Sequence, residues 1–275
     1  MGVVNLTPDS FSDGGQFLIG EDALAHARSL IAAGADMLDI GAESTRPGAE
    51  PVTAGEEIGR AAPVIAAIRA ESAIPISIDT MKPDVARAAA AAGATMWNDV
   101  TALRWRDESL ATAAELGCQV VLMHMRGEPR TMQAAPSYGD VVGEVCDFLV
   151  GRAEIAMAAG MAREKIWLDP GIGFGKTGRH SLTLLGHLDR IVALGFPVLL
   201  GASRKSFLGR IDQAASKTTD RLGGSLAAAL AGAAAGVAAV RVHDVRETVQ
   251  ALAVQAAIRN ASAEPSPRAS GERAG

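Results

Sequence analysis

The stretch IPISIDTMKPDVARAAAAAGATMWNDV, residues 74–100, contains the unit from which the rest of the chain is built. A short apolar run ends at Asp79, an alanine-rich segment follows and closes at a glycine, and a second apolar run ends at Asn98 and Asp99. An apolar run, a segment with helical periodicity and another apolar run predict a strand, a helix and a second strand parallel to the first. The unit therefore predicts a parallel β-sheet covered by helices.

The same unit recurs along the rest of the chain. Six further apolar runs end in polar or charged residues, as the first two do. They are 1–5, which ends at Asn5; 37–44, which reaches Glu43 and Ser44; 119–124, which ends at His124; 166–169, which ends at Asp169; 197–203, which reaches Ser203; and 238–244, which carries Arg241 and His243. Eight alternating β and α units in 275 residues predict a closed (β/α)8 TIM barrel, an α/β fold.

The connections and the end of the chain differ in composition from these units. Two long loops, 7–20 after the first strand and 43–57 after the second, are rich in Gly, Pro, Ser and Asp. Long loops of this kind in a compact domain usually have a function, and these two are expected to border the mouth of the barrel. We place one domain at 1–260, and we expect 261–275, which has almost no large apolar side chain, to be a disordered tail.

Composition excludes several classes of partner. The net charge is −5 and the basic residues are scattered, so neither nucleic acid nor an anionic membrane surface is expected to bind. The longest apolar stretch, 226–240, is rich in small residues and broken by Arg241, which fits a barrel helix feeding a strand. The two cysteines, Cys118 and Cys146, form no paired framework, and the first strand leaves no room for a signal peptide. We expect a cytoplasmic protein.

The polar strand ends predict an active site at one mouth of the barrel. A parallel strand is buried on both faces, so a polar residue at its carboxyl end is costly unless it faces an opening. Asp79 and Asn98 would stand on neighbouring strands, where a carboxylate beside an amide can bind the mixed donor and acceptor edge of a heterocycle. Asp169 can accept two parallel hydrogen bonds from a guanidine-like edge. The alternative for each is a residue that caps a helix or braces a loop.

The last two strands predict an anion site. Ser203, Arg204 and Lys205 follow the seventh strand, and Arg241 and His243 lie at the eighth, where barrels of this class commonly bind phosphate. A solvated basic surface is the alternative, but such charge runs normally lie on helices.

Two other motifs are interpreted as structural or set aside. His124 is flanked by methionines in an apolar run, and we interpret it as a structural histidine rather than a catalyst. The segment 169–177, DPGIGFGKT, resembles the end of a phosphate-binding loop, but Pro170 occupies the place of the first required glycine. Histidine spacing makes a zinc site improbable, whereas a hard cation held by Asn5 and ligand phosphates remains open.

Eight motifs in order resemble one known family, the dihydropteroate synthases of folate biosynthesis. The motifs are MGVVNLTPDSFSDGG, DIGAESTRPGA, ISIDT, WNDV, LMHM, DPGIGFGK, GASRKSFLG and RVHDV. The resemblance runs from Met1 to Ile258 and implies an enzyme, a transferase. In its reaction, the amine of p-aminobenzoate replaces pyrophosphate on the methylene group of hydroxymethyl-dihydropterin pyrophosphate, giving dihydropteroate.

The resemblance also implies roles for individual residues. The residues that hold or border the pterin are Asp79, Asn98, Met123, Asp169, Phe174, Lys205 and Arg241. Those that meet the pyrophosphate are Asn5, Arg241 and His243, with Mg²⁺ held at Asn5. Those of the p-aminobenzoate site are Phe11, Thr45, Arg46, Pro47 and Ser203. Those nearest the chemistry are Asp79, Lys205, Arg241 and His243. We expect a homodimer.

Two alternatives and one departure accompany the resemblance. A pterin-binding methyltransferase would share the barrel and the aspartate and asparagine of the pterin site, but not the STRPG and SRKS motifs. A paralogue that binds pterin without turnover would share the site, although the presence of Arg46, Lys205 and His243 argues against it. Relatives usually carry a segment ahead of the first strand, so we expect the barrel floor to be incomplete or the start to be truncated.

Overall fold

The strands form the predicted closed barrel. The computed structural model describes residues 1–6, 16–44, 50–127 and 131–263. The strands are β1 (Gly2–Asn5), β2 (Leu38–Gly41), β3 (Ile76–Asp79), β4 (Met96–Asp99), β5 (Gln119–Met123), β6 (Ile166–Asp169), β7 (Leu199–Leu200) and β8 (Ala239–Val240). β1 to β6 pair in sequence order, β7 pairs with β8, and every pair is parallel. Bridges of Leu168 with Val198 and of Gly2 with Val242 close the ring.

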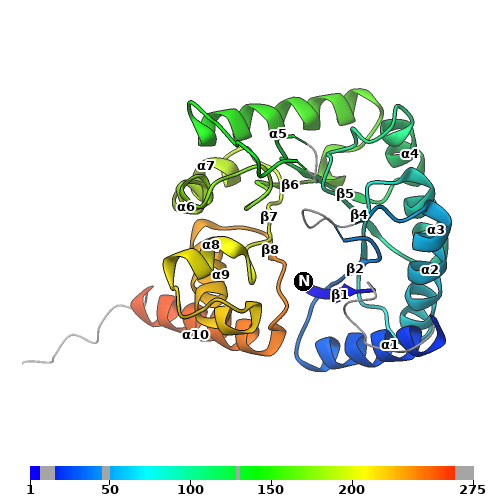
Figure 1. The fold of residues 1–275 in the computed structure, drawn as a ribbon, viewed down its shortest axis with the longest axis horizontal. Coiled ribbons are helices and arrows are strands. Elements are labelled where there is room, and N and C mark those ends of the chain that lie inside the picture. Colours follow the sequence, from blue (N-terminus) through cyan, green and yellow to red (C-terminus); the bar gives the residue numbers. More distant parts are fainter. Residues whose placement is uncertain (7–15, 45–49, 128–130, 264–275) are drawn as a thin grey trace, which may run out of the picture.

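Helices surround the barrel (Figure 1). They are α1 (Gln16–Ala32), α2 (Ala54–Glu71), α3 (Pro83–Ala92), α4 (Ser109–Leu116), α5 (Val141–Ala158), α6 (Gly178–Gly186), α7 (Leu188–Val192), α8 (Ser206–Ile211), α9 (Leu222–Ala235) and α10 (Val245–Ala263), with short 3₁₀ turns η2 (Arg163–Lys165) and η3 (Thr218–Arg221). None of the helices in the described part of the chain is long and apolar enough to span a membrane.

Three boundaries differ from the sequence-based expectation. α1 begins at Gln16 and α2 at Ala54, so both long loops are shorter than predicted. Thr53 explains the second start, because its hydroxyl accepts from the Glu56 amide at 3.3 Å while the Glu56 carboxylate accepts from the Thr53 amide at 3.0 Å. α10 continues to Ala263, two residues past the expected start of the tail at Ala261, and residues 264–275 lie outside the described part.

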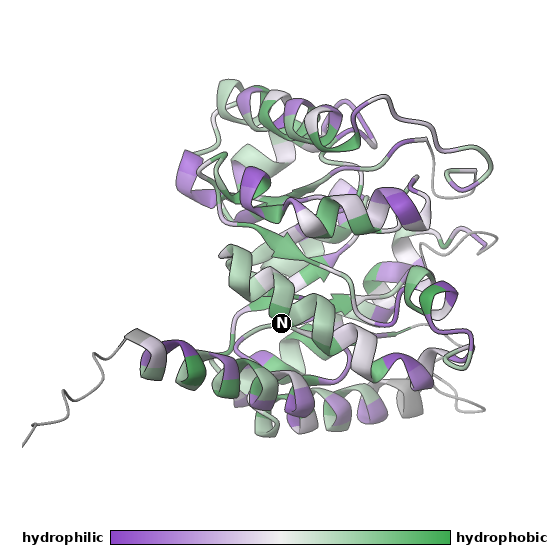
Figure 2. Ribbon diagram, turned by 90° about the vertical axis from the view of Figure 1, so that its left-hand side faces the viewer, coloured by the Kyte–Doolittle hydropathy of each residue, from purple (hydrophilic) through white to green (hydrophobic). Residues whose placement is uncertain are grey.

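Two of the apolar clusters pack the outside and the inside of the barrel. The larger packs the helices against the outside of the barrel, and Figure 2 shows apolar strands inside helices of mixed polarity. The smaller cluster includes Met1, Met96, Val121 and Leu199 and belongs to the amino-terminal half of the strands. Residues two apart on a strand point to the same face, so Asn98 points into the barrel like Met96 but lies nearer the carboxyl end of β4.

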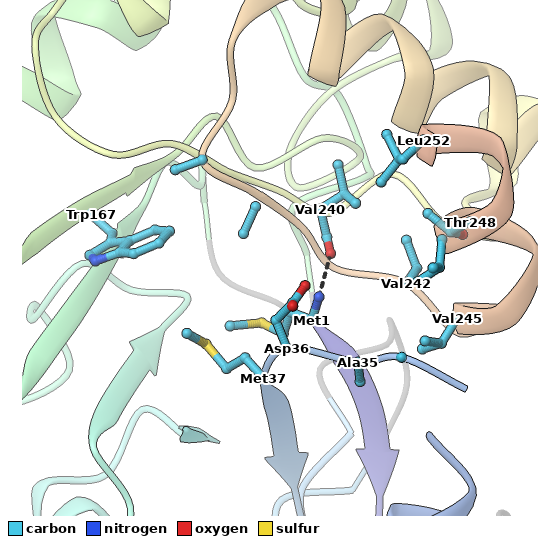
Figure 3. A pocket seen from close by; sticks show the side chains of 14 residues that line it. Met1, Ala35, Asp36, Met37, Trp167, Val240, Val242, Val245, Thr248 and Leu252 are labelled. Atoms are coloured by element: carbon cyan, nitrogen blue, oxygen red, sulfur yellow. Dashed lines mark hydrogen bonds between the residues drawn. The ribbon is translucent and has the colours of Figure 1, made fainter. Parts of the chain in front are cut away.

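The floor of the barrel contains a cavity of about 230 Å³ (Figure 3). Met37, Trp167 and Val242 contribute to its mainly apolar lining, and the amino group of Met1 donates to the Val240 carbonyl at 2.9 Å. The segments that line it lie at the amino-terminal ends of the strands or on α10. This cavity lies at the opposite end of the barrel from the polar strand ends.

A buried ion cluster joins the loop after β2 to α2 and to the start of α3. The Lys82 ammonium lies 2.8 Å from Glu43 Oε2 and 2.7 Å from Glu57 Oε2. Glu57 is fully buried, and this burial raises the pKa of its carboxyl group. Glu43 also accepts from the Val52 amide at 3.0 Å, so it holds the end of the loop that leads into α2. The cluster braces the two consecutive βα connections after β2 and β3.

Replacing Lys82 with methionine should destabilise the fold. The change leaves the Glu57 carboxylate buried without its cation, which typically costs about 3–5 kcal/mol. Urea denaturation should show this loss in the free energy of unfolding. The matched control combines Lys82→Met with Glu57→Gln. The second change removes the uncompensated charge, so the double variant should recover much of the lost stability. Equal stability of the single variant and the parent would contradict this role.

Candidate functional site

Polar side chains from most of the barrel meet at the carboxyl ends of the strands. The register aligns Asn5 with Gly41, Gly41 with Asp79, and Asp79 with Asn98, so these four residues lie side by side on β1 to β4. A Cβ on Gly41 would lie 3.8 Å from Asp79 Oδ2 and 3.9 Å from Asn5 Oδ1. The glycine therefore leaves space between the amide and the carboxylate. The structure brings these predicted site residues together.

Arg241 joins two carboxylates inside the barrel. Its Nε donates to Asp39 Oδ2 at 2.5 Å, and its Nη2 donates to Asp79 Oδ2 at 2.9 Å. Asn98 Nδ2 donates to the same Asp39 oxygen at 3.4 Å. Burial acts to lower the pKa of Arg241, but the charges of Asp39 and Asp79 outweigh it and raise that pKa above its ordinary value. The guanidinium therefore stays charged and holds β2, β3 and β8 together.

Asp79 is a carboxylate whose charge is costly. Its side chain is 19% exposed, and burial raises its pKa to about 7. The Asp39 charge raises the pKa further, whereas the charges of Arg241 and Lys205 oppose the rise. Near neutral pH, a carboxyl group with this pKa changes between two forms. The carboxylate only accepts hydrogen bonds, whereas the carboxylic acid both donates and accepts them.

Asp169 combines the two roles that the sequence left open. Its Oδ1 accepts from the Gly171 amide at 2.6 Å and so braces the loop after β6. Its Oδ2 lies 3.9 Å from the position of a Cβ on Gly201, so glycine leaves that side open. Burial raises the pKa of Asp169, against the Gly171 hydrogen bond and the nearby lysines. One oxygen thus holds the loop, and the second faces the barrel interior.

Asp99 has only the bracing role. Its carboxylate accepts from the amides of Thr101 and Leu103 at 2.7 Å and 2.9 Å, and it is fully buried. Burial raises its pKa to about 6. Asp99 therefore stabilises the turn after β4 and does not face the mouth in the way that Asp79 does.

The loop after β6 carries an aromatic wall of the site. Lys205 Nζ lies 4.2 Å from the centroid of the Phe174 ring, a cation–π contact. Phe174 packs against a methionine-rich cluster that consists of Met81, Val100, Met123, Met125 and Met132. This cluster provides a polarisable apolar surface beside the carboxylates, suited to the face of a flat ring.

The anion side contains a serine and histidine pair. The Ser203 hydroxyl lies 3.0 Å from His243 Nδ1 and accepts from the His243 amide at 3.2 Å. Burial lowers the pKa of His243 to about 4, and the charges of Arg241 and Arg204 lower it further. His243 is therefore neutral at pH 7 and supplies a hydrogen bond rather than a positive charge.

His124 is a structural residue, as the sequence indicated. Its Nδ1 lies 2.8 Å from Lys176 Nζ, and its ring packs edge-on against Phe148 with centroids 4.9 Å apart. Burial and the Lys176 charge lower the pKa of His124 to about 3. Lys176 also donates to the carbonyls of His124 and Phe174, which ties the loops after β5 and β6 together.

Four predicted site residues lie outside the described part of the chain. They are Phe11, Thr45, Arg46 and Pro47. Their roles in the p-aminobenzoate site stay predictions. Within the described residues, groups of three or more His, Cys, Asp or Glu that could hold a metal ion are absent.

Sequence reasoning missed Asp39 and Lys176. Asp39 is a fully buried carboxylate in the middle of β2, and only the end of that apolar run was considered. A charged residue two positions before Gly41 points to the same barrel face, so the strand period was the available signal. Lys176 was set aside with the phosphate-loop motif, and its role as a brace depends on a contact with His124 at the end of β5 that no local motif reveals.

Comparisons with known proteins agree with this geometry. A family model described as pterin binding enzyme matches residues 1–243. The dihydropteroate synthase of Synechocystis sp. is 46% identical over 259 residues, which cover 94% of this chain and 89% of that protein.

Solved structures extend the likeness to the fold. Xanthomonas albilineans dihydropteroate synthase with 4-aminobenzoic acid matches with a TM-score of 0.89 and 49% identity, covering 96% of this chain and 93% of that one. The same enzyme in complex with 7,8-dihydropteroate matches with a TM-score of 0.85 and 46% identity, with coverage of 96% and 93%. On this identity and coverage, the chain belongs to the pterin-binding enzyme family, among its dihydropteroate synthases.

Proposed function

We propose that the carboxylates at the strand ends hold the pterin ring of the substrate while the β7 and β8 side holds its pyrophosphate. The observation that carries this proposal is that the buried Asn98 and Asp169 and the partly buried Asp79 lie at one end of the barrel, beside an apolar cluster. An aminopyrimidine edge presents parallel N–H donors, which carboxylate and amide oxygens match. Met123 and Phe174 would then lie against the faces of the ring.

In dihydropteroate synthesis the methylene carbon loses its bond to the pyrophosphate oxygen and gains one to the amine nitrogen, which releases a proton. A protein nucleophile is not required, because the electron-rich pterin stabilises positive charge on the methylene. Lys205 and Arg241 would stabilise the charge that grows on the leaving group, and His243 would donate a hydrogen bond to it. Asp79, Lys205, Arg241 and His243 are thus the proposed catalytic residues, and the chain otherwise positions the two substrates.

For p-aminobenzoate we propose Ser203 together with Phe11, Thr45, Arg46 and Pro47. Ser203 supports this assignment by its position at the end of β7, where the hydroxyl already pairs with His243. The other four residues enter through the motif resemblance alone.

The site fits a magnesium ion that the substrate brings, rather than one held by a protein cage. Asn5 offers an amide oxygen next to Asp79, and Mg²⁺ commonly binds through one or two protein oxygens together with phosphates and waters. Bound there, the ion would neutralise pyrophosphate charge. Addition of EDTA should reduce turnover and excess Mg²⁺ should restore it, and full activity in EDTA would rule out this role.

We also propose a homodimer in the cytoplasm. Leu182 on α6 and Ile211 at the end of α8 are exposed apolar residues on helices that contact one another, as at many subunit interfaces. Cys118 and Cys146 are free thiols, which suits a reducing compartment. Analytical ultracentrifugation and cell fractionation test these two statements, and a monomer or a secreted protein would contradict them.

The reaction itself is tested by pyrophosphate release. The chain should release pyrophosphate from hydroxymethyl-dihydropterin pyrophosphate only when p-aminobenzoate is present, because the amine is the attacking group. Dihydropteroate should appear in equal amount by chromatography. Pterin binding without pyrophosphate release would point instead to the methyltransferase or non-catalytic alternatives, and release that does not depend on the amine would contradict attack by the amine.

Asp169→Asn should weaken pterin binding by about 10- to 150-fold, which corresponds to the 1.5–3 kcal/mol of a hydrogen bond to a charged group. An amide keeps one acceptor for the Gly171 amide but presents a donor to the ring. Calorimetry with hydroxymethyl-dihydropterin measures the change. Asp99→Asn is the matched control, because it alters a buried carboxylate that braces a turn, and its binding affinity should stay near that of the parent. Near-normal affinity of Asp169→Asn would disprove the assignment.

Pterin affinity should fall as the pH drops below about 7. The pKa of Asp79 is raised to about 7, so below it the free protein carries a protonated carboxyl group with a mismatched donor. Calorimetry between about pH 5.5 and 8.5, with the ring lacking pyrophosphate, avoids titration of the ligand phosphates. Asp39→Asn should move the fall to lower pH, because it removes a charge that raises the Asp79 pKa. A flat profile in the parent would contradict this role.

A further inference from the structure

Arg204 lies between two proposed site residues in an unfavourable backbone conformation. It separates Ser203 from Lys205 where the chain turns from β7 into α8, and its φ is 58°. Residues other than glycine rarely adopt this left-handed region, and they persist there when surrounding contacts over-determine the conformation. The contacts that hold Arg204 therefore decide how its two neighbours are presented.

The amide, the carbonyl and the guanidinium of Arg204 are each held by a different part of the chain. Its amide donates to the Ser225 hydroxyl of α9 at 2.9 Å, and its carbonyl accepts from Arg221 Nη1 at 3.0 Å. Its guanidinium forms a fork on both oxygens of Asp244, with Nε 3.1 Å from Oδ2. The fork is partly buried, with 31% exposure for Arg204 and 18% for Asp244.

The fork continues a pairing between the ends of β7 and β8. Ser203 pairs with His243, and the next residue in each strand end, Arg204 and Asp244, forms the ion pair. Two consecutive residues after β7 thus bind two consecutive residues after β8. On the far side of Arg204, Lys205 extends over the Phe174 ring.

We propose that Arg204 is a positioning residue that acts through Asp244 to set the Ser203–His243 pair and the direction of Lys205. The inference rests on the roles proposed above for Ser203, Lys205 and His243. Arg204 is suited to this task because a planar fork fixes orientation as well as distance, which a lysine at this position would not do. A partly exposed ion pair contributes little to global stability, so the effect should appear mainly in substrate affinity.

The test is a double-mutant cycle on Arg204→Ala and Asp244→Ala with steady-state kinetics for both substrates. Each single variant should raise the KM values by between about 10- and 100-fold, with a smaller change in kcat. The double variant should be no worse than the worse single one, because both act through the same pair. Arg204→Gly relieves the backbone strain and should be impaired like Arg204→Ala, since the fork is lost in both.

Controls separate this proposal from general destabilisation and from the proposed site. Arg28→Ala breaks a comparable fork on Glu71 at the α1 and α2 surface, and it should leave both KM values unchanged. Asp244→Asn retains the size of the side chain and serves if the alanine variants fail to fold. Normal KM values in folded Arg204→Ala, or additive losses in the cycle, overturn the proposal. If Ser203→Ala and Lys205→Ala also have normal KM values, the proposed site fails with it; if they are impaired, only the role of Arg204 fails.

Discussion

The contact of the Arg241 guanidinium with Asp39 and Asp79 is the interaction on which the polar half of the barrel depends. β8 is only two residues long, so it offers few backbone hydrogen bonds to hold the last connection in place. The guanidinium adds side-chain bonds across the barrel to β2 and β3. Without this cation, the buried Asp39 and the partly buried Asp79 would carry uncompensated charge in a medium of low polarity. The same contacts of Arg241 therefore help to close the barrel and set the charge of the site.

The barrel separates stability from chemistry along its axis. The amino-terminal half is filled by large apolar side chains such as Met96 and Val121, which exclude water and hold the strands. The carboxyl half carries charged groups that cost stability when buried, as the raised pKa of Asp79 shows. These charged groups face an opening, where a ligand can form hydrogen bonds with them. The apolar packing in the amino-terminal half thus offsets the stability that the buried charges cost at the carboxyl ends.

Side-chain contacts between the connections after the strands hold the site residues in place. Lys176 crosslinks the loops after β5 and β6, and Gly175 permits the close approach, because a Cβ there would lie 2.3 Å from the Arg126 carbonyl oxygen. Lys82 braces the connections after β2 and β3, and Arg204 joins those after β7 and β8. Each brace links neighbouring units, so the site groups are fixed to the scaffold even though they lie at loop beginnings.

The sequence by itself determined the barrel and the family, and it predicted that the polar strand ends lie together, because strand ends and motifs are local patterns that recur in order. It also indicated that Asp169 braces a loop or binds a ligand, and the structure shows the brace. Only the tertiary structure decided that Arg241 lies between Asp39 and Asp79, that His243 is neutral and that Arg204 pairs with Asp244. These properties arise from contacts between residues far apart in the chain and from burial. A local pattern cannot state which charges the closed barrel will bring together.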